Sequence, residues 1–186
     1  PQAMKLIEEA AGPVLNMSAG GTRQWLPHVV ELETAVFRNT DIVGDGHSLP
    51  FADGVFDVVL AINAFEHYRQ PNTVVAEILR VLKPGGRVFI HTAFLQPLHE
   101  PPWHFFNCTK FGLQEWFSPF EIASLRVSEN FNPIYALAWQ SCELLALLHA
   151  ERGTAIGNRI GTMPLHDIAA FWSQPASRNN PVWQEF

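Results

Sequence analysis

Short apolar runs separated by glycine, proline and asparagine dominate the first half of the chain. Val14–Met17, Val29–Glu33 and Phe56–Ile62 have the length and apolar content of buried strands. The last of these runs is almost continuously apolar, which is typical of a parallel strand that is buried on both faces. Thr40–Val43 and Arg87–Thr92 predict two further strands.

Helical spacing of apolar residues appears at both ends of this strand-rich region. Met4–Ala10 predicts a short helix, and Asn72–Leu82 predicts a longer amphipathic helix ahead of the last strand. The longer helix is expected to end at Lys83–Gly86, with a cation in its last turn and Pro-Gly just beyond it. The strand–helix–turn–strand order favours an α/β fold.

The links that follow the first two strands are too short for ordinary parallel crossovers. Only Gly21–His28 and Thr34–Asn39 are available, whereas such a crossover normally takes a dozen or more residues and a helix. We therefore expect loop crossovers at these points, and a sheet that lacks its usual helical cover there. C-terminal helices, or a second subunit in a homodimer, are expected to cover this part of the sheet.

The second half of the chain predicts a mainly helical region. Thr109–Phe117 predicts a helix with its threonine as the N-cap, and Pro133–Arg152 predicts a longer helix that opens on a proline. Ile122–Ser128 alternates apolar and polar residues, as a half-exposed strand does. A small helix near Leu165–Trp172 is expected ahead of a polar tail.

The size and charge of the chain narrow its class. At 186 residues it fits a single domain over residues 1–186 with a sizeable core. An apolar share of 47% and a charged share of 16% indicate a globular rather than a disordered chain. The net charge is −6 and the 12 lysines and arginines form no cluster, so nucleic acid is not expected as a partner.

The cysteines and the apolar segments indicate in which cellular compartment the protein is expected. Cys108 and Cys142 lie far apart, which suits a reducing compartment such as the cytoplasm and argues against a zinc knuckle or a disulfide framework. The most apolar stretch, around Ala136–Ala150, contains polar residues and is shorter than the ~20 residues of a membrane span. No membrane partner is therefore expected. The chain begins at Pro1 rather than Met, so we expect that an N-terminal piece is missing or removed.

The first strand ends abruptly in small residues. Val14–Met17 is followed by Ser18, Ala19, Gly20 and Gly21. At the carboxyl end of a parallel strand, such residues leave room for a nucleotide-type ligand to approach the backbone. The alternative is a purely structural glycine turn. No Gly-x-Gly-x-x-Gly turn opens a full helix here, which argues against a nicotinamide oxidoreductase.

Five segments in this order resemble the class I S-adenosylmethionine (SAM)-dependent methyltransferases. The segments are Val14–Thr22, Glu33, Gly44–Phe51, Phe56–His67 and Ile78–Arg87. The resemblance covers about residues 13–92 and is closest to the branch with small-molecule acceptors such as saccharides or natural products. It implies a doubly wound, mostly parallel Rossmann-like sheet. Residues 13–92 would form the cofactor-binding core, and residues 93–186 a substrate loop and helical cover.

The resemblance also assigns a cofactor site residue by residue. It implies that the small residues after the first strand lie against the methionine and ribose of SAM. The carboxylate of Glu33 would accept hydrogen bonds from the ribose hydroxyls, and Asp45 would accept one from the adenine amino group. Asn63 and Ala64 would face the amino end of the cofactor and the transferred methyl group. The full set is Asn16, Ser18, Ala19, Gly20, Gly21, Thr22, Glu33, Asp45, Gly46, His47, Asn63 and Ala64.

Departures from the family pattern bear on how well the cofactor binds. The family usually has an acidic residue in place of Asn16, and glycines in place of Ser18 and Thr22. Asn16 can still form hydrogen bonds but carries no charge to offset the ammonium of SAM, so we expect either weaker binding or an amine that is held elsewhere. The residues also have structural alternatives, because Glu33 could be a solvated charge at a strand end and Asp45 a turn-forming aspartate. The antiparallel last strand that the family usually adds is not expected, because the chain there predicts a helix.

Three histidines are candidates for the chemistry. The sulfonium of SAM is already activated, so methyl transfer depends mainly on positioning of the acceptor. A hydroxyl acceptor also benefits from a general base, and His67, His99 and His104 follow the carboxyl ends of central strands. Each could instead cap a helix or pack within its loop. Their spacing matches no ligand pattern and no carboxylate or cysteine pairs with them convincingly, so no metal is expected.

The sequence therefore predicts an enzyme that transfers a methyl group from SAM to a small acceptor. A sugar or a natural product is the expected acceptor class, and transfer to oxygen is favoured. The alternative is a non-catalytic methyltransferase-like domain that serves in binding or assembly, which the altered first motif and the short crossovers support. The sequence does not specify the acceptor itself.

Overall fold

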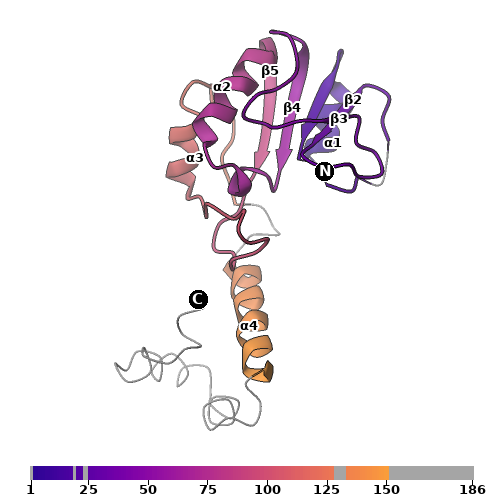
Figure 1. Ribbon diagram of the computed structural model, residues 1–186. Coiled ribbons are helices and arrows are strands. Elements are labelled where there is room, and N and C mark those ends of the chain that lie inside the picture. The colour runs from indigo at the N-terminus through magenta and orange to yellow at the C-terminus, as the bar shows by residue number, and fades with distance from the viewer. Residues whose placement is uncertain (1, 19, 23–24, 128–132, 151–186) are drawn as a thin grey trace. The chain divides into compact units, whose positions relative to one another are not determined.

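The computed structural model describes residues 2–18, 20–22, 25–127 and 133–150 (Figure 1). The chain divides into two compact units, one formed by Pro1–Phe94 with His99–Val127 and the other by Leu95–Leu98 with Ser128–Phe186. The single domain expected from the sequence stays a prediction. The expected helix near Leu165–Trp172 lies outside the described residues, as does Ala19 of the expected cofactor site.

The first unit is built on one parallel sheet. Its five strands have the order β3-β2-β1-β4-β5, and every neighbouring pair is parallel. This is the order of a doubly wound α/β sheet, and it confirms the fold class expected from the sequence. The strands are β1 Val14–Met17, β2 Val29–Glu33, β3 Ile42–Val43, β4 Phe56–Ile62 and β5 Leu82–His91.

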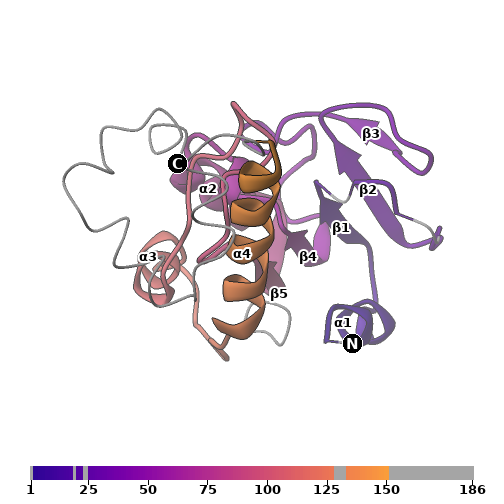
Figure 2. The ribbon, with the colours of Figure 1, turned by 90° about the horizontal axis from the view of Figure 1, so that it is seen from below.

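Helices lie on both faces of this sheet, as Figures 1 and 2 show for α1 and α2. On one face, β1 buries Leu15 and Met17 together with side chains of α2, the turn η1 and the end of α3. On the other, Val14 packs with Ile7 of α1. Successive strand residues point to opposite faces, so near-continuous apolar runs were needed to fill both cores. The helical elements are α1 Gln2–Glu9, η1 Phe65–His67, α2 Pro71–Val81 and α3 Lys110–Trp116.

Two details of the expected fold are wrong. The last-turn cation of α2 is Arg80 rather than Lys83, because the helix ends at Val81. Lys83 lies in β5 and its ammonium is 2.5 Å from Asp57. The strand expected over Ile122–Ser128 is absent from the described part, residues 122–127, whose side chains are mostly exposed and which pair with no strand. Alternation alone does not make a strand, because a strand also needs the edge of a neighbouring strand for its hydrogen bonds.

The expected loop crossovers are present after β1 and β2. No helix occurs between β1 and β3 in the residues that the structure describes. The two loops hold each other instead, because the side-chain amide of Asn39 donates to the carbonyl oxygen of Thr22 at 2.6 Å. The Asp41 carboxylate accepts from the backbone N–H of Glu31 at 2.9 Å, which ties the second loop to β2. Cover by C-terminal helices or a second subunit stays a prediction, and Val43 at this edge is exposed.

The expected C-terminal helices α3 and α4 are both present. Thr109 caps α3 as expected, since its hydroxyl accepts from the backbone N–H of Gly112 at 3.1 Å. In the second unit, α4 spans Pro133–Ala150 and confirms a helix where the family usually adds a strand. Among the described helices, none combines the length and the apolar character needed to cross a bilayer.

Candidate functional site

The site forms where the strand order reverses, between β1 and β4. Ser18 follows β1 and Asn63 follows β4, so the two lie at the carboxyl ends of adjacent parallel strands. Both are in the left-handed backbone region, with φ of 51° and 54°. This conformation is uncommon outside glycine and is found most often at functional sites, where the surrounding structure holds it. Ligands of doubly wound sheets bind at this same point.

The carboxylate of Glu33 is buried at the end of β2. Its side chain is 6% exposed, and its Oε1 accepts a hydrogen bond from the backbone N–H of Gly20 in the loop after β1. Burial raises the pKa of Glu33, although the backbone donors of Gly20 and Thr34 oppose the shift. The solvated strand-end alternative is therefore wrong for Glu33. A buried acceptor faces the glycine loop.

Asn16 has a charged neighbour that the sequence analysis did not single out as a site residue. Its Nδ2 donates to Oε2 of Glu31 at 2.9 Å, and strand register places the two residues side by side on β1 and β2. Glu31 is buried, and burial raises its pKa. The Oδ1 atom of Asn16 is itself buried without a partner among the described residues. A carboxylate from the neighbouring strand thus lies beside the position where the family usually has an acid.

Asp45 forms the turn that the sequence left open as an alternative. Its Oδ1 accepts from the backbone N–H of His47 at 2.9 Å and from His47 Nδ1 at 2.6 Å. Burial acts to raise the pKa of Asp45, but the two hydrogen bonds from His47 outweigh it and the pKa is lowered. Nε2 of His47 accepts from the N–H of Gln70, the residue that precedes α2. The turn after β3 is thereby fixed to the start of α2.

Tyr68 joins two of the expected cofactor segments, the loop after β1 and the turn after β3. Its hydroxyl is 2.8 Å from the hydroxyl of Ser18, and its ring meets the ring of His47 edge-on at 5.5 Å. A Cβ atom added to Gly46 would lie 2.9 Å from the Tyr68 ring, so the glycine lets the ring close against this turn. Burial raises the pKa of Tyr68, which stays protonated. The hydroxyl therefore keeps the hydrogen that it shares with Ser18.

Gly46→Ala is expected to lower the free energy of unfolding by about 1–3 kcal/mol, the usual cost of overpacking. The methyl group would displace the Tyr68 ring and strain its hydrogen bond with Ser18. Urea denaturation followed by circular dichroism measures the change. Gly21→Ala is the matched control, because a Cβ at Gly21 meets nothing within 4 Å. Equal stability of the two variants would contradict the role given to Tyr68.

Asn63 makes two contacts with the end of β5. Its N–H donates to the carbonyl oxygen of His91 at 2.7 Å, and its Oδ1 lies 2.8 Å from Nδ1 of that histidine. Burial lowers the pKa of His91, which favours the neutral ring. Ala64 is fully buried in the core, so its side chain packs among core residues.

The three candidate histidines lie together. The ring centroids of His67 and His99 are 5.2 Å apart, those of His99 and His104 are 4.1 Å apart, and those of His67 and His104 are 6.0 Å apart. Both ring nitrogens of His104 are engaged, Nδ1 with the backbone N–H of His99 and Nε2 with the carbonyl oxygen of Phe106. Burial, and then the neighbouring His99, lower the pKa of His104. His104 is therefore a neutral residue that holds the loop.

Glu66 and its contacts connect this histidine group to the end of the sheet. Its Oε2 accepts from the Thr92 hydroxyl at 2.9 Å, next to the His91 that contacts Asn63. Glu66 is 1% exposed. Neither Glu66 nor Tyr68 was expected as a site residue, although both directly flank His67. The sequence did place Glu66 and Tyr68 shortly after the predicted strand Phe56–Ile62, and this position could have marked them as candidates for the site.

Comparison with known proteins agrees with this geometry. Residues 26–90 match the family model described as a methyltransferase domain. A demethylmenaquinone methyltransferase from Renibacterium salmoninarum is 40% identical over 60 residues, which are 32% of this chain and 25% of that protein. The matched segments span about a quarter of the length of the curated relatives that lead the comparison.

Solved structures share the fold at low sequence identity. A Bacillus halodurans protein assigned as a methyltransferase superposes with a TM-score of 0.51 at 21% identity, covering 62% of this chain and 66% of that one. The YcgJ protein of Bacillus subtilis gives 0.53 at 17% identity, covering 84% and 86%. The solved structures show a Rossmann-like fold, and residues 26–90 match a methyltransferase domain. The resemblance seen in the sequence is confirmed over this part of the chain.

Proposed function

We propose that this chain binds SAM and transfers its methyl group to a small acceptor. The observation that carries the proposal is the buried Glu33 carboxylate, which reaches the glycine loop after β1 beside the point where the strand order reverses. A carboxylate there offers acceptors only and can take two ribose hydroxyls at once. The left-handed backbone of Ser18 and Asn63 supports the same location.

The remaining residues fit the other parts of SAM. The Asn16–Glu31 pair supplies the negative charge that the first motif lacks and would offset the ammonium group. Asp45, held by His47, would accept from the adenine amino group, and Gly46 would leave room for the base. Ser18, Gly20, Gly21 and Thr22 would line the methionine and ribose portions, and Asn63 and the backbone of Ala64 the methyl end. When bound, SAM supplies a methyl group already activated by its sulfonium.

The acceptor end is assigned to the histidine group beside Glu66. An acceptor hydroxyl must lose a proton as its oxygen is methylated, and His67 and His99 with the carboxylate of Glu66 are suited to hold or remove that proton. His104 positions the His99 backbone. We favour transfer to oxygen on a sugar or a natural product for this reason. Buried Cys108 and the free thiol of Cys142 are consistent with a reducing setting such as the cytoplasm.

Calorimetric titration with SAM and with its demethylated product tests the proposal. We expect one site per chain with a dissociation constant in the range of about 1 μM to 1 mM, where the KM values of enzymes commonly fall. Both ligands should bind, because they share the adenine and ribose that Glu33 and Asp45 would contact. If neither ligand binds, the proposed enzymatic function is refuted. It would favour the second candidate, a methyltransferase-like binding or assembly domain, which the short crossovers after β1 and β2 support.

A further inference from the structure

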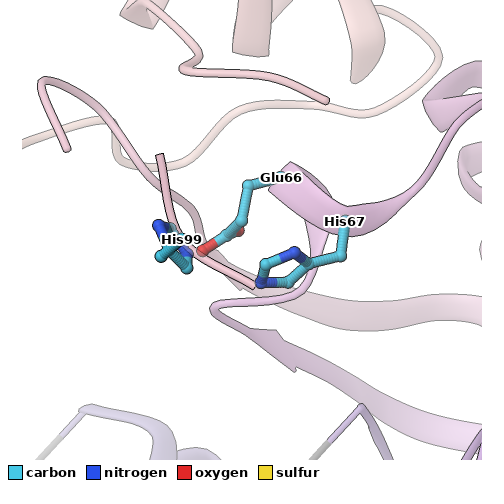
Figure 3. Close-up of side chains that lie close together, drawn as sticks. All are labelled: Glu66, His67 and His99. Carbon is cyan, nitrogen blue, oxygen red and sulfur yellow. The ribbon is translucent and has the colours of Figure 1, made fainter. Parts of the chain in front are cut away.

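Three side chains near the end of β4 could hold a metal ion. Glu66 and His67 come from η1, and His99 comes from the loop after β5. One ligand atom from each lies within 4.8 Å of the others, and Figure 3 shows the carboxylate of Glu66 between the two rings. This group was not expected from the sequence, because the loop that carries His99 lies about thirty residues along the chain from the other two and the spacing matches no ligand pattern.

The Glu66 carboxylate has an oxygen that needs a partner. Oε2 is taken by the Thr92 hydroxyl, whereas Oε1 is buried and makes no hydrogen bond among the described residues. The main chain of Glu66 is also held, because its backbone carbonyl accepts from the N–H groups of Phe105 and Phe106 at 2.8 and 3.3 Å. A buried carboxylate oxygen without a partner is costly, and a cation beside it removes the cost.

His67 is oriented as metal-binding histidines usually are. Nδ1 of His67 lies 2.9 Å from the carbonyl oxygen of Trp103, which fixes the hydrogen on Nδ1 and leaves the Nε2 lone pair available. Metal-binding histidines almost always donate their second nitrogen to a carbonyl or carboxylate in this way. His104 accepts from the backbone N–H of His99 and so anchors the third ligand residue.

We propose that Glu66, His67 and His99 bind one divalent transition-metal ion of the zinc type. Two imidazoles and one carboxylate suit such an ion and leave a coordination position open. The ligand atoms lie within 4.8 Å of one another. Tetrahedral bonds of about 2.0–2.2 Å place ligand atoms roughly 3.3–3.6 Å apart, so metal binding would draw these side chains closer together. The sequence analysis expected no carboxylate beside the histidines. The structure differs, because a Glu66 carboxylate oxygen lies within 4.8 Å of ligand atoms of His67 and His99.

The open coordination position on the ion would give the site a role in methyl transfer. This role rests on the proposed function. With the ion bound, Glu66, His67 and His99 would hold the ion and would not remove the proton themselves. An acceptor hydroxyl bound there would release its proton to solvent at a lower pH than a free hydroxyl does. The contacts from Glu66 to Thr92 and from His91 to Asn63 link the site to the methyl end of the cofactor site. Metal binding itself can be measured without SAM or an acceptor.

Titration of the chelator-treated protein with Co²⁺, followed by its visible absorption, tests the site. We expect one equivalent to bind with the spectrum of a low-coordinate ion, and Zn²⁺ to displace it. His67→Ala, His99→Ala and Glu66→Gln should each weaken binding by at least about tenfold, as loss of ligands or of their supporting partners does. His28→Ala is the matched control and should bind unchanged, since its ring contacts the carbonyl of Ile7 in α1 instead.

Circular dichroism of each variant confirms that it folds, and Glu66→Gln keeps an acceptor for the Thr92 hydroxyl. No Co²⁺ binding by the parent protein, or binding that the three variants leave unchanged, would overturn the site. SAM titration of the metal-free protein is scored separately. A protein that binds SAM but no Co²⁺ refutes the metal site alone, and one that binds Co²⁺ but no SAM refutes the proposed enzyme alone.

Discussion

Glu33→Ala is expected to weaken SAM binding at least about tenfold. The reason is that Glu33 is buried beside the glycine loop and would accept two charged hydrogen bonds from the ribose. A hydrogen bond to a charged group contributes about 1.5–3 kcal/mol, and 1.4 kcal/mol corresponds to a factor of ten in the dissociation constant. Alanine would also release the Gly20 N–H that Glu33 now holds. Calorimetric titration with SAM measures the change.

Two variants sharpen this test. Glu33→Gln keeps an oxygen for the Gly20 N–H but loses the charge, so its affinity should fall between those of the parent and the alanine variant. Glu115→Ala removes an exposed carboxylate from α3 and should leave SAM binding unchanged. If Glu33→Ala bound SAM as tightly as the parent protein, the ribose assignment would be refuted.

Phe65→Ala is expected to lower the free energy of unfolding by about 3–5 kcal/mol, as removal of a buried aromatic side chain usually does. Phe65 is fully buried, and its ring centroid lies 5.4 Å from that of Tyr68 and 5.1 Å from that of Phe117. It joins η1 to α3 and holds the residues on either side of the site. Equilibrium unfolding in urea, followed by circular dichroism, gives the free-energy difference.

Phe111→Ala is the control for this experiment. Phe111 lies on α3 and is 69% exposed, so its loss should change the unfolding free energy by no more than about 0.5 kcal/mol. The same residue type is thus removed from a buried and an exposed position of one unit. A cost for Phe65 no larger than that for Phe111 would mean that η1 is not anchored through this ring.

The strands were predicted best where burial on both faces left a continuous apolar signal. Val14–Met17, Val29–Glu33 and Phe56–Ile62 have the expected bounds, because polar residues or turns limit each run. The edge of the sheet was predicted less well. Thr40–Val43 keeps only Ile42 and Val43 as β3, since one neighbour supplies all of its pairing.

The extended start of β5 had no clear signal in the sequence. Lys83–Gly86 carries helix-stopping residues, and α2 does end just before them. The chain then runs directly into the strand, with a register shift where Phe56 pairs with Leu82 and Val58 with Arg87. Turn propensity predicted where the helix ends, but the path after it was set by pairing with β4.

The candidate site was predicted as far as strand ends could be located. Ser18 was identified because small residues follow the first strand, whereas Glu33 and Asn63 were assigned by the resemblance to methyltransferases. The structure places all three at the ends of strands. The neighbours that complete the site depend on tertiary contacts. Glu31 required the register of β1 and β2, and Tyr68 meets a serine fifty residues earlier in the chain. No local pattern reports such pairings.

The short turn from Phe65 to Tyr68 serves both halves of the proposed chemistry. Phe65 and Tyr68 pack into the core, and Tyr68 touches the cofactor segments, while Glu66 and His67 turn toward the ion site. A shift of the turn Phe65–Tyr68 that accompanies binding of the ion would therefore also shift the residues that contact the cofactor segments. Because energetic coupling between two sites is reciprocal, occupation of the ion site and occupation of the cofactor site should each preorganise the other. Under the two proposals, a substitution that changes the acceptor end of this turn would therefore also change the binding of SAM.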